Sequence, residues 1–325
     1  MLDMTSEKNR ILVQIERKKR EGSGIYSFVL RDVSGKNLPA FSPGSHINLY
    51  LKSGLIRQYS ICSDPMEMGF YKIAVLLADK SRGGSREVHQ LEVGDKIEIS
   101  PPLNDFPLAD EQEEAVLIAG GIGITPLMSM AIELARNNTA FMLHYLARSK
   151  THSAFRKELP ATLGEERISF RFDDKEGMLT EDEILSMLGP AQEKRHVYVC
   201  GPEGLITTVE RTAQKNDWQE DNIHYERFGA DPALATGKSV TIKLAHSGQE
   251  IIGHAHQSLA QSLIDAGISI QTSCERGICG TCVVPLLEGT AEHRDSYLSK
   301  DEKESMTKIA LCCSRAITDY IIIDV

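Results

Sequence analysis

The first hundred residues alternate short apolar runs with turn residues, which is the pattern of an all-β domain. The runs are rich in β-branched and aromatic side chains, and the breaks between them carry pairs such as Pro43-Gly44 and Gly94-Asp95. Short strands with closely spaced turn signals are typical of an antiparallel barrel or sandwich. The predicted strands are Ile11–Ile15, Ile25–Leu30, His46–Leu51, Tyr71–Leu77 and Lys96–Ile99. A short helix is expected over Ser85–Leu91.

The pattern changes near Glu113, where a continuous apolar run from Ala115 to Ala119 begins. Such a run is typical of a strand buried on both faces of a parallel sheet. Strand-like and helix-like segments then alternate, which indicates a doubly wound parallel α/β domain. The further predicted strands are Phe141–Leu146, Ile168–Phe172 and His196–Cys200, and the predicted helices are Leu127–Ala135, Thr180–Leu188 and Glu203–Lys215.

The last part of the chain predicts a third, compact α+β domain of about ninety residues, a usual size for a small domain. Its predicted elements are a hairpin from Ser239–Ala245 and Glu250–His254, a helix over Gln257–Ala266, a strand over Val283–Leu287, a short helix over Glu302–Lys308 and a strand over Tyr320–Val325. We therefore expect a multidomain chain with domains at residues 1–110, 111–229 and 238–325, and with a linker at residues 230–237.

Composition narrows the class of protein. The chain has 325 residues, of which 41% are hydrophobic and 25% charged, as is ordinary for a soluble globular protein. Its net charge of −10 argues against a nucleic-acid-binding surface, and no apolar run reaches the length of a membrane span. The N-terminal residues lack the apolar core of a signal peptide, and seven cysteines at this length fit a reducing compartment. We expect a cytoplasmic protein that binds neither nucleic acid nor membranes.

The cysteines near the C-terminus carry the most specific chemistry. Cys274, Cys279 and Cys282 follow the pattern C-x4-C-x2-C, and Cys312 follows after 29 further residues. This is the plant-type ferredoxin spacing for a [2Fe–2S] cluster, whose two irons need four thiolates. A zinc site, the alternative, usually has two C-x2-C pairs or cysteine–histidine pairs, and only one C-x2-C is present here.

The cysteine region also contains two glycines and a fifth cysteine. Gly277 and Gly280 suit a loop that folds its backbone around a cluster, because glycine tolerates unusual dihedral angles. Cys313 adjoins Cys312, and neighbouring residues of an extended segment point to opposite sides, so only one of the two can face the iron.

Glycines between a strand and a helix indicate a nucleotide-phosphate loop in the second domain. Gly120, Gly121 and Gly123 follow the apolar run, Thr125 is a candidate N-cap, and Pro126 is a candidate first helical residue. A second strand ends at Cys200-Gly201-Pro202. Ligands of such sheets bind beyond the carboxyl ends of the strands, so this turn is expected to border the same crevice. For Cys200 alone, simple packing is the commoner role.

Two segments of the first domain also suit an anionic, aromatic cofactor. Arg57 and Tyr59 share one face of a predicted strand, next to Ser60, where a guanidinium can pair with a phosphate and a ring can lie against a heterocycle. The run Ser81 to Ser85, with Gly83 and Gly84, opens the predicted helix and could bind an anion. A charged strand and an ordinary glycine turn are the plain alternatives.

In this order, the motifs R-Q-Y-S, S-R-G-G-S, G-G-I-G-I-T-P, C-G-P and C-E-R-G-I-C-G-T-C resemble those of the phthalate dioxygenase reductase family, over essentially the whole chain. The resemblance implies a flavin-binding β-barrel, an NAD-binding domain and a plant-type ferredoxin domain. It also implies a cytoplasmic NADH-dependent reductase that passes electrons through FMN and a [2Fe–2S] cluster to a partner oxygenase, most often of the Rieske type, through transient docking.

The resemblance also carries site residues over to this chain. For FMN they are Arg57, Tyr59, Ser60, Gly83, Gly84, Ser85 and Phe228. For NADH they are Gly120, Gly121, Gly123, Thr125, Asp173, Cys200, Gly201 and Pro202. For the cluster they are Cys274, Cys279, Cys282 and Cys312, because L-C-C-S-R-A resembles a segment in which the first cysteine is the ligand.

Asp173 is the candidate for the adenosine ribose hydroxyls and favours NADH over NADPH, whereas Arg148 argues the other way. No acid–base residue is obligatory for hydride transfer between cofactors. The alternatives are a reductase for another acceptor such as a cytochrome P450, a plain NADH flavin reductase, and a redox sensor without turnover.

Overall fold

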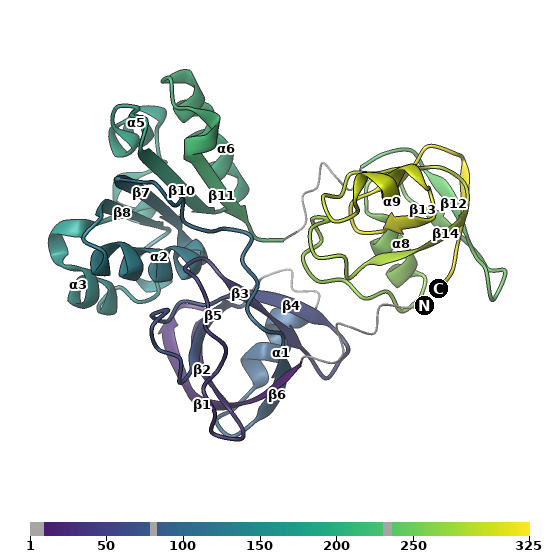
Figure 1. The fold of residues 1–325 in the computed structure, drawn as a ribbon, viewed down its shortest axis with the longest axis horizontal. Coiled ribbons are helices and arrows are strands. Elements are labelled where there is room, and N and C mark those ends of the chain that lie inside the picture. The colour runs from purple at the N-terminus through teal and green to yellow at the C-terminus, as the bar shows by residue number, and fades with distance from the viewer. Residues whose placement is uncertain (1–9, 79–82, 230–235) are drawn as a thin grey trace. The chain divides into compact units, whose positions relative to one another are not determined.

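The computed structural model describes residues 10–78, 83–229 and 236–325, and it divides into two compact units. The first unit comprises residues 1–51 and 58–228, and the second comprises residues 52–57 and 229–325. The expected linker at 230–237 lies mostly outside the described residues. Figure 1 shows the path of the chain through both units.

The N-terminal part of the first unit is an antiparallel β-barrel. Its sheet has the strand order β4-β3-β6-β1-β2-β5 among the described residues, and an antiparallel bridge between Ile61 and Ile73 joins the end of β4 to β5. This bridge brings the two edge strands of the sheet together at one point, as in a partly closed barrel. The elements are β1 (Ile11–Gly22), β2 (Ile25–Asp32), β3 (His46–Tyr50), β4 (Ile56–Ser60), β5 (Tyr71–Leu76), α1 (Gly84–Gln90) and β6 (Lys96–Ile99).

A parallel sheet of order β11-β10-β7-β8-β9 forms the rest of this unit. The doubly wound arrangement predicted from the alternation of elements is therefore confirmed. Its elements are β7 (Glu114–Gly120), α2 (Ile124–Arg136), β8 (Ala140–Ala147), α3 (Glu158–Leu163), β9 (Ile168–Phe172), α4 (Asp173–Glu176), α5 (Glu181–Leu188), β10 (Arg195–Gly201), α6 (Glu203–Lys215) and β11 (Ile223–Arg227).

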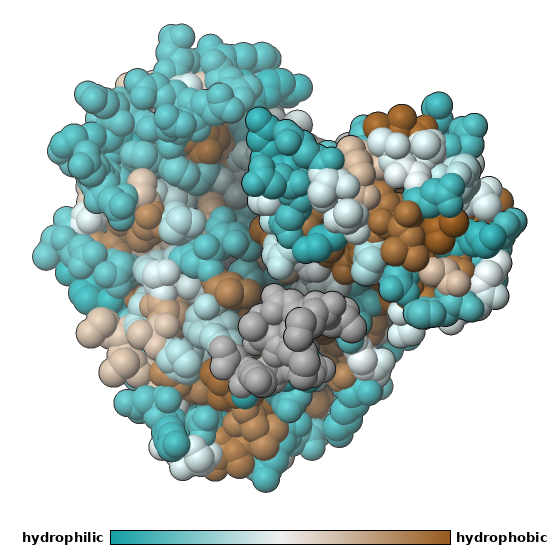
Figure 2. Space-filling view, turned by 45° about the vertical axis from the view of Figure 1, so that its right-hand side comes forward, coloured by the Kyte–Doolittle hydropathy of each residue, from teal (hydrophilic) through white to brown (hydrophobic). Residues whose placement is uncertain are grey.

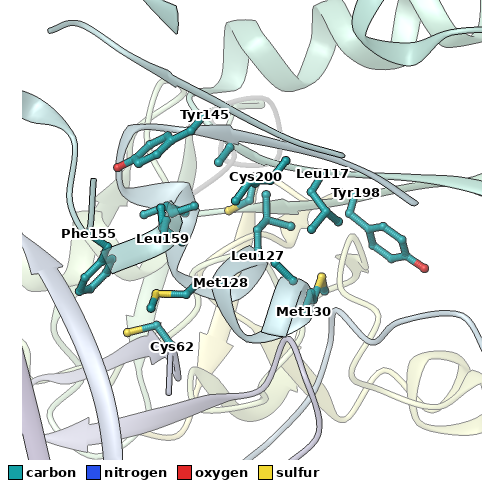
Figure 3. Packing of buried hydrophobic residues seen from close by; sticks show 14 of the residues in the cluster. Cys62, Leu117, Leu127, Met128, Met130, Tyr145, Phe155, Leu159, Tyr198 and Cys200 are labelled. Atoms are coloured by element: carbon teal, nitrogen blue, oxygen red, sulfur yellow. The ribbon is translucent and has the colours of Figure 1, made fainter. Parts of the chain in front are cut away.

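Alternate residues of each central strand face opposite layers of helices. Leu117 of β7 packs with Leu127 of α2 on one face, whereas Ile118 packs with Ile206 of α6 on the other. Figure 3 shows the first of these cores, in which Leu117, Leu127 and Cys200 lie together. Burial of β7 on both faces explains why its sequence is an unbroken apolar run.

The barrel and the parallel sheet share one core within the first unit. Cys62 and Phe106 of the barrel side pack in the same cluster as Met128 and Phe155 of the nucleotide-binding side. At Gly44, an added Cβ would lie 1.9 Å from the carbonyl oxygen of Phe106, so the backbones approach too closely for any side chain there. The apolar contact fixes the position of the barrel against helix α2 and the segment after β8.

The second unit is a mixed sheet of order β13-β12-β18-β14-β16, with helix α8 packed against it. Its elements are β12 (Val240–Leu244), β13 (Glu250–Gly253), α8 (Leu259–Asp265), β14 (Val283–Glu288), β15 (Ala291–Glu292), α9 (Lys300–Glu304), β16 (Lys308–Ala310), β17 (Arg315–Ala316) and β18 (Tyr320–Ile323). The predicted hairpin and the predicted helix near Ser258 are confirmed, and the Ser258 hydroxyl accepts a hydrogen bond from the Gln261 amide.

The short helix predicted over 302–308 is displaced toward the N-terminus. The helix is Lys300–Glu304, because Ser299 and Glu302 form a reciprocal capping box that starts it two residues before the predicted beginning. Met306 has a left-handed φ of 50°, and Lys308 already belongs to β16. The prediction missed the capping box and so placed the helix too late.

A buried guanidinium ties the segments of the second unit together. Arg315 is 1% exposed, and it donates hydrogen bonds to the carbonyl oxygens of Gln257, Lys238 and His254. The neutral variant Arg315→Met would remove the donor of these three hydrogen bonds.

We expect Arg315→Met to destabilise the second unit by about 3 kcal/mol, since it removes three hydrogen bonds that each contribute about 1 kcal/mol. Hydrogen exchange of residues 236–325 during chemical denaturation measures this change. Lys243→Met, at an exposed position of β12, is the matched control and should change the stability by less than about 0.5 kcal/mol. Equal stability of the two variants would contradict a stabilising role for Arg315.

Candidate functional site

The carboxyl ends of β7 and β10 meet at the point where the strand order of the parallel sheet reverses. From β7 the chain proceeds outward to β8 and β9, and it then returns to the other side to form β10 and β11. In open α/β sheets the ligand crevice lies at this reversal. The turns Gly120–Gly123 and Gly201-Pro202, which the sequence proposed as neighbours, follow these two strands.

Glycine is required here because the two turns approach closely. A Cβ on Gly123 would lie 2.1 Å from the carbonyl oxygen of Cys200, and a Cβ on Gly201 would lie 2.8 Å from the Cα of Gly120. Gly121 has a φ of 57° and open space around it. A pyrophosphate approaching this turn would meet backbone amides at the start of α2 without obstruction by side chains.

The predicted N-cap role of Thr125 is wrong. Helix α2 begins at Ile124 after a 3-10 turn over Gly121–Gly123, so Thr125 already lies inside the helix. Its buried hydroxyl donates a hydrogen bond to the Ile122 carbonyl oxygen at 3.0 Å. The glycine turn starts the helical backbone earlier than a capping pattern would suggest, and α2 has no side-chain cap.

The remaining predicted NADH residues lie at the same edge of the sheet or under it. Cys200 is fully buried in the core shown in Figure 3. Asp173 follows β9, two strands away from β7, and its carboxylate accepts a hydrogen bond from the buried Arg171 at 3.0 Å. Arg171 also pairs with Glu183 of α5, so Asp173 belongs to a network that joins β9 to its helices.

The predicted FMN residues lie on the barrel and after β11. Arg57 and Tyr59 lie on β4 between the buried residues Ile56 and Ser60, and both are half-buried. Ser85 of α1 accepts a hydrogen bond from the Ala78 amide at 3.2 Å, and Gly83 has a φ of 104°. Phe228 is 45% exposed directly after β11. Ser81 and Arg82 lie outside the described residues.

Strand pairing explains how the fourth cysteine reaches the cysteine loop of the second unit. Val283 of β14 pairs with Ala310 of β16, and the Leu311 amide donates a hydrogen bond to the Cys282 carbonyl oxygen at 3.2 Å. The residue before β14 is Cys282, and Cys312 lies two residues beyond β16. Both therefore fall in one small buried cluster, together with Cys313.

Hydrogen bonds link the thiols of the second unit. Cys274 is hydrogen-bonded to Cys279, which lowers the pKa of Cys274 to about 5, and Cys312 is hydrogen-bonded to both Cys282 and Cys313. Of the four proposed ligands, Cys279 is half-buried and the other three are buried. They supply the four thiolates that a two-iron cluster takes.

The loop between these cysteines has the backbone that its glycines predicted. Gly277 and Gly280 have φ values of 75° and 73°. A Cβ on Gly277 would lie 2.5 Å from the Sγ of Cys313, and one on Gly280 would lie 2.3 Å from the ring of Tyr297. Cys313 is fully buried against this loop.

Sequence reasoning missed the segment that holds this loop from behind. The amides of Ser296 and Tyr297 donate hydrogen bonds to the Gly277 carbonyl oxygen at 3.0 and 3.1 Å. The preceding residue, Asp295, is buried and contacts the cysteine segments. Residues 293–298 show neither helical nor strand periodicity. The available signal for this segment was a run of polar residues between two apolar segments of a small domain.

The second unit also exposes apolar surface, as Figure 2 shows. Its large hydrophobic side chains with an exposed fraction above one third include Ile252, Ile264, Leu287, Tyr297, Ile317 and Tyr320. Among residues 10–78, 83–229 and 236–325, no helix combines the length and apolar character needed to cross a bilayer.

Two protein families match parts of this chain. Residues 242–317 match the family described as the 2Fe-2S iron-sulfur cluster binding domain. Residues 117–211 match the family described as the oxidoreductase NAD-binding domain. The two matches fall on the second unit and on the parallel sheet of the first.

Relatives and solved structures resemble the whole chain. The vanillate O-demethylase oxidoreductase of Acinetobacter baylyi is 39% identical over 92% of this chain and 94% of its own length. The solved structure of phthalate dioxygenase reductase, described as modular for electron transfer from pyridine nucleotides to [2Fe-2S], has a TM-score of 0.74 and 34% identity, and covers 98% of this chain and 99% of its own. An intact self-sufficient cytochrome P450 monooxygenase has a TM-score of 0.70 and 33% identity over 97% of this chain, which corresponds to 41% of its own.

Fold and site together define an NAD(P)H-dependent oxidoreductase that carries a flavin-binding barrel, a nucleotide-binding sheet and a ferredoxin-like unit. The chain belongs to the phthalate dioxygenase reductase family, whose members are reductase components of oxygenases. NADH, FMN and a [2Fe–2S] cluster are its cofactors.

We expect Gly123→Ala to destabilise the first unit and to weaken NAD⁺ binding, because the new Cβ would overlap the backbone at Cys200. The cost of such overpacking is typically 1–3 kcal/mol. Thermal unfolding and calorimetric titration with NAD⁺ measure the two effects.

Gly204→Ala is the matched control, since a Cβ there meets no atom within 4 Å on helix α6. Replacing an exposed helical glycine with alanine stabilises by roughly 0.5–1 kcal/mol. If both variants behaved alike, the close approach of the two turns would not be the reason for glycine at position 123.

Proposed function

We propose that this protein is the electron-supplying component of a terminal oxygenase system, and that the residues assigned above hold its cofactors. NADH supplies two electrons as a hydride, the flavin accepts them together and releases them singly, and the cluster accepts one electron at a time. The observation that carries the proposal is that strand pairing brings Cys312 beside Cys282 of the cysteine loop, in the same chain as a glycine turn at the reversal point of a parallel sheet.

The protein's own residues bind and orient in this proposal. The turns at Gly121 and Gly201 leave the carboxyl edge of the sheet open to the dinucleotide. Thr125 lies inside helix α2, which follows the Gly121 turn. Arg57 and Tyr59 are half-buried on β4, where a guanidinium and a ring suit a phosphate and a flat heterocycle. Asp173 stays a proposed contact of the ribose, and Cys200 stays a proposed contact of the nicotinamide, with Pro202 and Gly120 beside Cys200.

No general acid or base is needed at this site, because a hydride passes directly from one ring to another. The work of the chain is therefore to place two rings face to face and to exclude water. The core that the barrel shares with helix α2 supports this role, since it holds the barrel and the nucleotide-binding sheet in one unit.

We further propose that the partner docks transiently on the second unit and that the system is cytoplasmic. The exposed apolar side chains of this unit offer surface that a partner protein could cover. A Rieske-type oxygenase is the favoured partner, on the similarity to a vanillate O-demethylase oxidoreductase over nearly the full length of both chains.

A cytochrome P450 is the second candidate partner, because a self-sufficient P450 monooxygenase contains a region similar to 97% of this chain. The two candidates differ in a direct test. NADH oxidation is followed while a purified Rieske demethylase or a purified P450 is titrated in. A saturable increase in rate with only one of them identifies the class of partner, whereas no increase with the Rieske protein would contradict the favoured assignment.

The cysteine assignment is tested with Cys279→Ser. This variant should lose electron delivery to an acceptor protein such as cytochrome c, because one iron loses a thiolate ligand. Flavin reduction by NADH, followed as bleaching in an anaerobic stopped-flow instrument, should continue at a similar rate.

Cys313→Ser is the matched control, since this thiol is buried but is not a proposed ligand. It should keep both activities, while Cys312→Ser should behave like Cys279→Ser. If Cys313→Ser lost the cluster and Cys312→Ser kept it, the choice between the adjacent cysteines would be reversed. Loss of flavin reduction in a folded Cys279→Ser variant would contradict the separation of the two functions.

A further inference from the structure

A buried carboxylate lies behind the cysteine loop, and nothing in the assigned chemistry uses it. The side chain of Asp295 has no exposed surface. Its Oδ2 accepts a hydrogen bond from the Leu298 amide at 2.9 Å, and its Oδ1 accepts one from the Ser314 hydroxyl at 3.1 Å. Buried carboxylates are costly in free energy, so this one calls for an explanation.

Asp295 touches both segments that bring the cysteines together. An added Cβ on Gly277 would lie 2.9 Å from the Cβ of Asp295 and 2.5 Å from the Sγ of Cys313. Ser314, which hydrogen-bonds to the carboxylate, lies two residues after Cys312. The negative charge is therefore fixed beside the loop that carries Cys274, Cys279 and Cys282 and beside the segment that carries Cys312.

The charge is only partly compensated. The Lys303 Nζ lies 3.9 Å from Oδ2, and its side chain is 30% exposed. The Nδ1 of His293 lies 3.5 Å from Oδ1, and the two ring nitrogens of this buried histidine make no hydrogen bond within the described residues. Electrostatic interactions in such a dry environment are stronger than in water, so the carboxylate acts over a longer range.

The hydrogen bonds of Asp295 use both carboxylate oxygens, Oδ2 for the Leu298 amide and Oδ1 for the Ser314 hydroxyl. An asparagine can occupy the same place with one bond reversed, because its carbonyl oxygen accepts from the Leu298 amide and its amide group donates to the Ser314 hydroxyl oxygen. What asparagine cannot supply is the negative charge. The charge and the shape of this side chain can therefore be separated by experiment.

We propose that Asp295 sets the reduction potential of the cluster, holding it lower than the cysteine loop alone would. A fixed negative charge opposes the addition of an electron, and net charge is one of the main determinants of iron–sulfur potentials. A lower potential makes the reduced cluster a stronger donor to the partner oxygenase. This inference rests on the cysteine ligands proposed above.

The test is a redox titration of the purified holoprotein at one fixed pH, followed by the electron paramagnetic resonance signal of the reduced cluster. Asp295→Asn should raise the midpoint potential by an amount that corresponds to about a tenfold change in the equilibrium constant for reduction, which is 59 mV for one electron. Lys303→Gln, which removes the compensating positive charge, should lower the potential by a smaller amount.

An exposed ion pair on the same helix provides matched controls. Lys300 and Glu304 are 87% and 67% exposed, and their charges lie 3.8 Å apart. Because exposed charges are screened by solvent, Lys300→Gln and Glu304→Gln should leave the potential almost unchanged. Shifts as large as those at Asp295 and Lys303 would show a nonspecific effect of net charge and would overturn the proposal.

The outcomes separate this inference from the cluster assignment. A wild-type protein without the reduced-cluster signal would refute the proposed ligands. A normal signal in Asp295→Asn with an unchanged potential would refute the role of Asp295 and leave the ligands intact. If Asp295→Asn failed to assemble a cluster, Lys303→Gln decides alone: a lowered potential supports the proposal and an unchanged one overturns it.

Discussion

The antiparallel pairing of β14 with β16 is the contact on which the electron-transfer site depends. Three cysteines come from one loop, but the fourth is separated from them by 29 residues, and only tertiary structure can return it. The register that pairs Val283 with Ala310 does so, because it places the residues flanking the two strands together. The core of the second unit stabilises this register, so the same apolar side chains that fold the unit also assemble the thiols.

A comparable constraint governs the first unit. The ends of β7 and β10 lie so close together that the two turns have room only for glycine at positions 123 and 201. That approach opens the carboxyl edge of the sheet to a dinucleotide, and the shared core at Cys62 and Phe155 holds the barrel beside it. Backbone packing, with few polar side chains, therefore shapes a site whose chemistry is supplied by the cofactors.

Much of this architecture could be predicted because each element carries a local signal. The unbroken apolar run before Gly120 marked a doubly buried strand, and the cysteine spacing marked the cluster loop. The N-cap role predicted for Thr125 was wrong because the prediction considered only the helix that follows. The 3-10 turn before this helix depends on contacts with β10, which no local pattern shows. Asp295 has no local pattern, since its burial follows from the packing of residues that are distant in sequence.

An anaerobic absorption spectrum of the purified protein, recorded before and after the addition of NADH, tests the central claim most directly. The account predicts flavin and iron–sulfur bands in the oxidised protein, with both bleached by NADH. Flavin bands without cluster bands after reconstitution would reduce the protein to a plain flavin reductase. A protein that bound no flavin at all would contradict the account of the barrel.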